Sequence, residues 1–239
     1  VEKVLRTVVE SYGYEEIRFP IVEKTDLYTR SNEAADIVTK EMYTFQDKGG
    51  ESISLRPEGT AGCVRAAIDN DLVRTDKPRL WYSGPMFRYE RPQKGRSRQF
   101  HQFSAEVFGI DSPEIDAELI LMSARIWKEL GLLENVKLEI NNLGDEQTRI
   151  SYSEALVKFL KNQKDELDED TQRKLIENPL RILDSKSKTV QDLLEKAPSI
   201  EDFVNEDSKK FNMKFLEILE THGIEYEVNP KLVRGLDYY

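Results

Sequence analysis

The chain has 239 residues, long enough for one large domain, or a domain with an inserted module, that buries a substantial core. Its 35 Lys and Arg against 45 Asp and Glu give a formal net charge of −10, which excludes a protein that coats nucleic acid through bulk positive charge. One cysteine and two histidines exclude an intrachain disulfide and a Cys/His metal cage, and no apolar run approaches the ~18 residues of a membrane span. We therefore expect a soluble, cytoplasmic protein with no membrane partner.

The N-terminal part predicts a helix followed by an extended segment. Apolar residues recur with helical spacing over residues 1–8, and Gly13 can end this helix in the left-handed conformation. The next stretch, "YEEIRFPIVE" at 14–23, is extended, but Pro20 lacks the N–H that a sheet ladder needs. The stretch is therefore an edge strand, which the local pattern favours, or a segment lying against something else, such as a second subunit.

A hairpin and a second helix follow. "YTFQDKGGESISLR", residues 43–56, has two extended runs joined by a Gly-Gly turn. "PEGTAGCVRAAI", residues 57–68, places proline where helices often start. Glu58 and Thr60 are therefore expected at a helix N-terminus.

The second half predicts helices inserted into a larger domain. A serine and a proline at the head of 112–131 predict a helix over that range, and "VKLEINNLG", residues 136–144, predicts a strand. The sequence then becomes polar and helical, with charge runs that are most simply solvated helix faces. We predict a main domain over 1–150, a helical insertion over 151–223 and a return to the main domain over 224–239.

The densest positive charge lies in "FRYERPQKGRSRQFHQF", residues 87–103. Strand-forming runs at 80–90 and 98–109 flank a glycine-containing loop, so this region predicts a β-hairpin. Alternation along the strands places a charged, amidic and aromatic set on one face: Met86, Arg88, Glu90, Phe100, Gln102, Ser104 and Glu106. The opposite face carries a set that is expected to be core: Phe87, Tyr89, Phe103 and Val107.

The charged face has two interpretations that the pattern alone leaves level. Unpaired charges are costly to bury, so the face is not core, but many antiparallel sheets have one charged side in water. Two other motifs favour a binding site: "LRPEGT" brings a carboxylate and a hydroxyl, and "LVRGLDYY" brings an arginine and two tyrosines. Such a set can hold phosphate, a flat base and a small amine-bearing ligand.

Neither the histidines nor the cysteine are expected to be catalytic. His101 alternates to the face opposite Gln102, so a packed or hydrogen-bonded structural role is expected. His222, beside Gly223, is placed to favour a helix C-terminus. Cys63 is most simply a helix packing residue.

Four motifs of the chain resemble the catalytic domain of the histidyl-tRNA synthetases, a family of class II aminoacyl-tRNA synthetases. "YGYEEIRFPIVE" is similar to the dimer-forming motif 1 and "GPMFRYERPQKGRSRQFHQFSAEVFG" to motif 2, while "LRPEGTAG" and "LVRGLDYY" resemble the histidine-binding motifs. The resemblance runs from about Tyr12 to Tyr239, and four motifs in this order are highly specific. It implies an α+β fold, in which an antiparallel sheet flanked by helices forms the active site and a helical insertion follows motif 2.

The resemblance also implies roles for single residues. The ATP site would consist of Arg88 on the α-phosphate, Glu90 on the nucleotide, Arg96 on the outer phosphates and Phe100 stacked on adenine. The histidine site would consist of Glu58, Thr60 and Gln102 on the ammonium group, Arg88 and Arg234 near the carboxylate, and Glu106 with Tyr239 and Tyr238 at the imidazole. Arg234 would be the catalytic arginine on the α-phosphate, together with Arg88.

The implied reaction joins histidine to its tRNA at the expense of ATP. The histidine carboxylate attacks the α-phosphate and pyrophosphate leaves, after which the histidyl group passes to the 3′-terminal ribose of the tRNA. Mg²⁺ is implied because the phosphate charge of ATP needs neutralising, and no residue of the chain is assigned as a metal ligand. A homodimer through the motif 1 region is implied as well.

The chain also departs from the family. It lacks motif 3 and the anticodon-binding domain, so we expect a fragment of a longer enzyme, and "SNEAADIV" at 31–38 is one residue shorter than the usual loop. The alternative is a non-catalytic paralogue that binds histidine, such as the regulatory subunit of ATP phosphoribosyltransferase. Such paralogues typically lose motif 2, whereas this chain keeps Arg88, Phe100, Glu106 and Arg234. A purely structural dimerisation module leaves the charged hairpin face unexplained.

Overall fold

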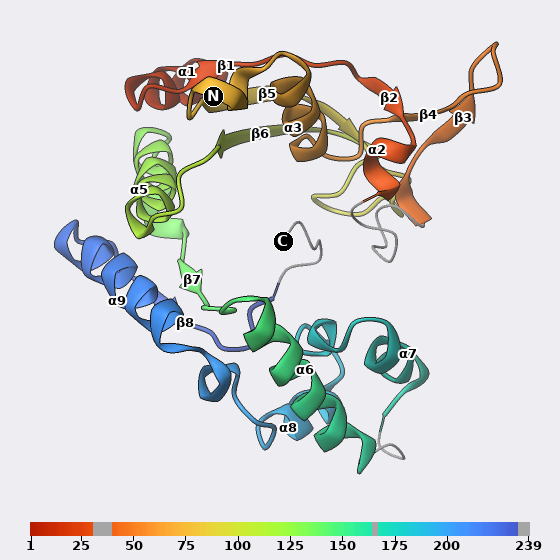
Figure 1. Ribbon diagram of the computed structural model, residues 1–239, viewed down its shortest axis with the longest axis vertical. Coiled ribbons are helices and arrows are strands. Elements are labelled where there is room, and N and C mark those ends of the chain that lie inside the picture. The colour runs from red at the N-terminus through yellow and green to blue at the C-terminus, as the bar shows by residue number, and fades with distance from the viewer. Residues whose placement is uncertain (31–39, 164–166, 234–239) are drawn as a thin grey trace. The chain divides into compact units, whose positions relative to one another are not determined.

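The computed structural model of the chain describes residues 1–30, 40–163 and 167–233. These residues form two compact units, one over Val1–Glu134 and one that begins at Asn135. The first unit contains two three-stranded sheets, and the second is mainly helical (Figure 1). No helix in the described ranges is long and apolar enough to cross a membrane.

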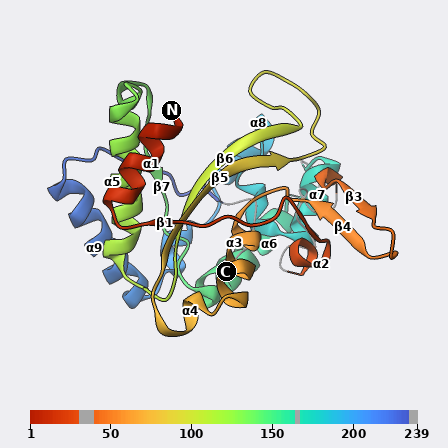
Figure 2. The ribbon, with the colours of Figure 1, turned by 90° about the horizontal axis from the view of Figure 1, so that it is seen from above.

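The central sheet of the first unit is built on the predicted hairpin. Strands β5 (Arg79–Phe87) and β6 (Gln99–Val107) pair antiparallel along their whole length, and they form the long ribbon of Figure 2. The short strand β1 (Glu15–Glu16) pairs parallel with β5 at the edge of this sheet. The edge-strand prediction is confirmed on both sides of Pro20: β1 is an edge of this sheet, and Val22 and Glu23 lie in β2 (Val22–Lys24), an edge strand of the second sheet.

Helices cover one face of this sheet through an apolar cluster. Helix α1 (Glu2–Ser11) contributes Val8 and Val9, and helix α5 (Pro113–Glu129) contributes Met122 and Ile126. These side chains pack around Trp81 of β5. Both helices end as predicted, since glycines in the left-handed conformation follow them (Gly13, φ 80°; Gly131, φ 68°).

The other face of the sheet is covered by helix α3 (Thr60–Asp69). Cys63 and Ala67 of this helix pack with Leu80, Tyr82 and Met86 of β5. We expected that this face is not part of the core. Along β5 that expectation was wrong, because α3 buries Met86 completely. The packing role predicted for Cys63 is confirmed.

The expected core position of Tyr89 was also wrong. Tyr89 is 55% exposed and lies two residues beyond the end of β5, where its backbone N–H donates to the Glu41 carbonyl at 2.7 Å. Its ring instead lies against the guanidinium of Arg98, 4.0 Å from the ring centre.

The second sheet of the first unit has the order β2-β4-β3. Strands β3 (Thr44–Gln46) and β4 (Ser52–Leu55) form the predicted hairpin, and β2 (Val22–Lys24) pairs antiparallel with β4. The short helices α2 (Asp26–Thr29) and α4 (Leu72–Thr75) complete this unit.

The second unit consists of helices around a core of its own. Its elements are the two-residue strands β7 (Glu139–Ile140) and β8 (Glu227–Val228), which pair parallel, and helices α6 (Glu146–Lys161), α7 (Glu169–Glu177), α8 (Lys188–Leu194) and α9 (Glu206–Thr221). Leu156, Leu160 and Ile182 are fully buried in its core. The helical insertion predicted for 151–223 lies within this unit, although its first residue falls inside α6.

Candidate functional site

The predicted site residues that the structure describes gather on one face of β5 and β6 and on the loop before α3. Residues directly opposite each other in an antiparallel pair share a face. Phe100 lies opposite Met86, Gln102 opposite Gly84, and Glu106 opposite Leu80. Phe100, Gln102 and Glu106 therefore project from the same face of the sheet, as alternation predicted. Arg234, Tyr238 and Tyr239, and the loop 31–38, lie outside the described residues.

Glu58 lies at the N-terminus of α3, as predicted, and is buried there. Its carboxylate accepts hydrogen bonds from the backbone N–H of Thr60 at 2.5 Å and of Ala61 at 3.0 Å. The first N–H groups of a helix have no partner within the helix, and the positive end of the helix dipole favours a carboxylate at this place. Glu58 therefore holds the first turn of α3, and each of its oxygens keeps one further lone pair for a ligand.

Glu106 lies beside Thr60, across from the first turn of α3. The Thr60 hydroxyl donates to Glu106 Oε1 at 2.9 Å, and the Tyr82 hydroxyl approaches the same oxygen at 3.2 Å. Thr60 and Glu106 were assigned to different ends of the histidine ligand, and the structure brings them into direct contact. Together with Glu58 they place carboxylate and hydroxyl groups at one end of the hairpin face.

Gln102 lies between Glu106 and Phe100 along β6. Its Nε2 donates to the Ser104 hydroxyl at 3.2 Å. Its Oε1 is buried and has no hydrogen-bond partner among the described residues. A buried carbonyl without a partner is costly, so this atom is an acceptor suited to a ligand N–H.

Arg88 continues the same face beyond the end of β5. Its Nε donates to the carbonyl of Pro57 at 2.8 Å, and its guanidinium lies 5.0 Å from the centre of the Phe100 ring. The first contact ties motif 2 to the loop that carries Glu58. The second places a cation over the ring that was predicted to stack on adenine, so phosphate and base would be bound side by side.

Glu90 lies between two arginines at the base of the basic loop. Its carboxylate oxygens are 3.8 Å from Nη1 of Arg88 and 3.8 Å from Nε of Arg96. Arg96 closes a tight turn in which Gln93 and Arg96 bridge each other and Gly95 adopts a φ of 80°. Two arginines around one carboxylate leave net positive charge here, which suits a phosphate chain.

Two buried residues of this region were missed by the sequence reasoning. Tyr82, 2% exposed, bonds Glu106, and alternation from Met86 and Arg88 along the strand could have placed it on this face. Arg56, 6% exposed, donates from Nε to the Pro85 carbonyl at 2.9 Å and from Nη1 to the Phe19 carbonyl at 3.1 Å. Nothing in the local sequence signals the partners of Arg56, since they come from distant segments.

Burial shifts the pKa of two groups beside the site. Burial, with the nearby carboxylates of Glu106 and Glu58, raises the pKa of the Cys63 thiol to about 12. Burial also raises the pKa of the Tyr82 hydroxyl, and its hydrogen bonds with Ser104 and Thr60 oppose that shift only in part. A raised pKa disfavours the thiolate, which is the nucleophilic form, so no nucleophilic role is assigned to Cys63, and a protonated Tyr82 can donate a hydrogen bond.

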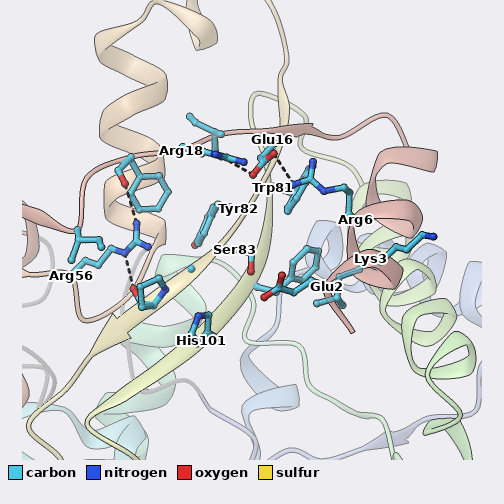
Figure 3. A pocket seen from close by; sticks show the side chains of 17 residues that line it. Glu2, Lys3, Arg6, Glu16, Arg18, Arg56, Trp81, Tyr82, Ser83 and His101 are labelled. Atoms are coloured by element: carbon cyan, nitrogen blue, oxygen red, sulfur yellow. Dashed lines mark hydrogen bonds and ion pairs between the residues drawn. The ribbon is translucent and has the colours of Figure 1, made fainter.

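His101 lies on the opposite face from Gln102, as predicted, but it is exposed rather than packed. It lines a pocket of about 690 Å³ with Ser83, Arg6 and Arg18 (Figure 3). Glu16 within this pocket accepts from Arg18 at 2.9 Å and pairs with Arg6 at 3.0 Å. The second histidine meets its prediction, since His222 follows α9 and its Nδ1 lies 2.8 Å from the Ile218 carbonyl.

The described residues contain no group of three or more His, Cys, Asp or Glu side chains that could hold a metal ion. Glu58, Glu90 and Glu106 are instead occupied by a helix start, two arginines and two hydroxyls. A divalent ion at this site would depend on oxygens supplied by its ligand.

A family model described as histidyl-tRNA synthetase matches residues 1–239. The chain is 42% identical to the apo histidyl-tRNA synthetase of S. aureus, with a TM-score of 0.77. That match covers 100% of this chain and 54% of the other, so the chain spans about half the length of that protein. It confirms the predicted α+β fold of a class II catalytic domain.

Two more distant structures share the fold. One is an ATP phosphoribosyltransferase regulatory subunit/histidyl-tRNA synthetase from Bacillus halodurans, with 20% identity, a TM-score of 0.62, and coverage of 99% of this chain and 64% of that one. The other is a histidine–tRNA ligase subunit from Alicyclobacillus acidocaldarius, with 19% identity, a TM-score of 0.58, and coverage of 100% and 76%.

Proposed function

The chain belongs to the histidyl-tRNA synthetase family, and from this premise we propose that it activates histidine with ATP to histidyl-adenylate and transfers the histidyl group to the 3′ end of tRNA. The observation that carries the proposal is the convergence of Arg88, Phe100, Gln102 and Glu106 on one hairpin face beside Glu58 and Thr60. This face combines a phosphate-binding cation, a flat ring and several acceptors. A regulatory paralogue has no need of the first two.

The proposed chemistry brings two anions together. The carboxylate of histidine attacks the α-phosphate of ATP, a bond forms between carboxylate oxygen and phosphorus, and the bond to the departing pyrophosphate breaks. Arg88 and Arg234 screen the repulsion and stabilise charge at phosphorus, so no nucleophile from the protein is needed. Phe100 stacks on adenine, Glu90 contacts the nucleotide, and Arg96 holds the outer phosphates.

The proposed histidine pocket recognises both ends of its ligand. Glu58, Thr60 and Gln102 take the ammonium group, and the unpartnered Oε1 of Gln102 supports this role. Glu106, together with Tyr239 and Tyr238, binds the imidazole. A site built on such hydrogen bonds rejects amino acids that lack the matching groups by about 10⁴-fold.

Mg²⁺ belongs to the proposal as the partner of ATP. It neutralises phosphate charge and needs near-octahedral oxygen ligands, usually one or two carboxylates together with phosphates. Glu90, the carboxylate beside the proposed phosphate arginines, is held between Arg88 and Arg96, so the ion would depend mainly on the phosphate oxygens of ATP and on water.

We further propose a homodimer through the motif 1 region, in the cytoplasm. The pocket of Figure 3 supports the dimer, because the segment that follows β1 lines it and leaves Ile21, one of its lining residues, 41% exposed, and the neighbouring Val22 is 43% exposed. Apolar side chains at the rim of a hollow are typical of a contact between subunits. The mass of the full-length protein in solution tests this.

Histidine-dependent exchange of pyrophosphate into ATP, measured on the full-length protein, tests the proposed activity. Exchange with histidine, and with none of the other amino acids, is expected. Arg234→Ala is expected to lose about 3 kcal/mol of transition-state stabilisation, the scale of a lost oxyanion donor. Near-normal exchange by this variant would refute the role of Arg234, and histidine binding without exchange would support the regulatory paralogue instead.

A further inference from the structure

We propose that Tyr82 is a positioning residue that orients the carboxylate of Glu106 for reading the histidine side chain. The inference rests on the proposed function and adds to it a residue outside the four motif assignments. Tyr82 does not touch the ligand in this proposal. It acts through Glu106.

The first support is the hydrogen bonding of one oxygen. Tyr82 Oη lies 3.2 Å from Glu106 Oε1, and Thr60 Oγ1 lies 2.9 Å from the same atom. A carboxylate oxygen has two lone-pair sites, so the two hydroxyls occupy both. The donors come from different elements, β5 and the start of α3, and together they define the plane of the carboxylate. The two hydroxyls thereby restrict the orientation in which the carboxylate is presented to a ligand.

The second support is that the Tyr82 ring cannot move aside. A Cβ atom at Gly59 would overlap Cε2, Cζ and Oη of Tyr82, and the Tyr82 ring forms a T-shaped pair with Phe19, with ring centres 5.0 Å apart at 74°. Phe19 in turn lies close to Gly62, whose Cβ would be only 2.7 Å from that ring. Glycine at 59 and 62 is therefore required by space at these two positions, and both rings are confined by α3 and its approach.

The third support is the protonation of the phenol. Burial raises the pKa of Tyr82, so its hydroxyl keeps its proton throughout the working range of an enzyme. A neutral phenol that faces a carboxylate can only donate. The contact therefore has one direction, from the Tyr82 hydroxyl to the Glu106 carboxylate.

The same packing connects the motif 1 segment to the site. Phe19 belongs to "YGYEEIRFPIVE", its ring confines Tyr82, and its carbonyl accepts from the buried Arg56. Arg56 also stacks over the Phe19 ring, 5.0 Å from its centre. The position of Glu106 thus depends on a segment to which no ligand contact is assigned.

The test compares Tyr82→Phe with a matched variant, Tyr14→Phe, in the full-length protein. Tyr14 is also 2% exposed and donates to a carboxylate, Glu118, at 3.1 Å, but it lies in the cluster under α1 and α5. Both changes remove one buried hydroxyl from one carboxylate. A general loss of stability from the missing hydroxyl is therefore expected in both variants, although Glu118 is also held by Arg79.

We expect Tyr82→Phe to raise the KM for histidine about tenfold in pyrophosphate exchange, the effect of one hydrogen bond to a charged group. The KM for ATP and kcat should stay within about twofold, since loss of folded protein lowers kcat and leaves KM unchanged. Tyr14→Phe should leave all three values near those of the wild type. Gly59→Ala, which displaces the Tyr82 ring, should reproduce the change in the histidine KM.

Glu106→Gln, measured beside these variants, separates this inference from the function on which it rests. If Glu106→Gln raises the histidine KM but Tyr82→Phe behaves like Tyr14→Phe, Tyr82 has no positioning role and the inference is overturned alone. If Glu106→Gln changes nothing, the assignment of the imidazole to Glu106 fails and the inference falls with it. A large rise for both Glu106→Gln and Tyr82→Phe supports the two together.

Discussion

Single residues of this site serve the fold and the proposed ligand at once. Glu58 holds the first turn of α3, and Arg88 ties the hairpin to the carbonyl of Pro57. Arg56 spans two carbonyls from distant segments and is almost completely buried. Each charge is therefore satisfied by backbone groups before any ligand arrives, which is how a charged group can be buried without a large cost.

Gly84 makes the position of Arg56 possible, and its replacement is a test at the residue scale. A Cβ atom at Gly84 would overlap Nη2 of Arg56. Because Arg56 is anchored to two carbonyls, it cannot swing away without losing them. We expect Gly84→Ala to lower the free energy of unfolding by about 1–3 kcal/mol, the usual cost of overpacking, in urea denaturation.

A double-mutant cycle identifies the cause. In the Arg56→Ala background, Gly84→Ala should cost much less, because the overlapping guanidinium is gone. Equal costs in the two backgrounds would show that the loss comes from the strand itself and not from Arg56.

Among the elements, helices α6, α7 and α9 of the second unit begin at side-chain caps, whereas α8 has no side-chain cap. Asp145, Asp168 and Asn205 each accept from the backbone N–H three residues later, at the starts of α6, α7 and α9. Asn205 also donates to Asp145 Oδ2 at 2.6 Å, so the starts of α6 and α9 are linked. Such caps satisfy N–H groups that the helix cannot, and they define where each helix begins.

The cap on α6 predicts a pH dependence of stability. Hydrogen bonds from the hydroxyl and the backbone N–H of Thr148 hold the pKa of Asp145 below its ordinary value of 3.8. A carboxyl whose pKa is lower in the folded state adds stability above its unfolded pKa, and this contribution is lost as pH falls through the folded pKa. Wild type should therefore melt at a higher temperature than Asp145→Asn at pH 6.

That difference in melting temperature should shrink as the pH is lowered below about 4, in scans monitored by circular dichroism. The asparagine variant keeps a capping oxygen but cannot titrate, so it isolates the charge. A difference that stays constant between pH 6 and pH 3.5 would mean that the carboxylate charge contributes nothing at this helix start.

At the scale of the whole molecule, the chain is divided into two units with separate cores. The first unit has apolar clusters on both faces of the β1-β5-β6 sheet, and the second has one cluster among its helices. All the described residues of the proposed site belong to the first unit. The chain has a net charge of −10, and its densest run of positive charge is confined to the loop between β5 and β6, at one end of the hairpin.

Two core variants test this division. Met86 and Leu156 are both completely buried, one in each unit, and truncation of either to alanine should cost about 2–5 kcal/mol of stability. Met86→Ala should also raise the KM for ATP, because Met86 lies opposite Phe100, the residue proposed to stack on adenine. Leu156→Ala should leave this KM unchanged at temperatures where the protein stays folded. A similar rise in both variants would show that the site depends on the second unit.

Much of this protein could be read from the sequence, because the deciding interactions are local. Helical spacing and a following glycine predict α1, turn residues predict the β3–β4 hairpin, and alternation assigns Phe100, Gln102 and Glu106 to one face. The four motifs identify the family, which its model and the S. aureus structure confirm. The roles of Arg234, Tyr238 and Tyr239 stay predictions.

The tertiary structure decided what depends on contacts between distant segments. Alternation along a strand assigns each side chain to one face of the sheet. Only the packing of α3 shows that Met86 is buried, and that the hydroxyls of Thr60 and Tyr82 both contact one oxygen of Glu106. Likewise, the sequence shows an arginine at position 56, but its partners, Phe19 and Pro85, lie far away along the chain. The sequence thus determined the elements and the family. The close packing of Gly59 and Gly62 against the rings of Tyr82 and Phe19 determined how the side chains of the site are held in place.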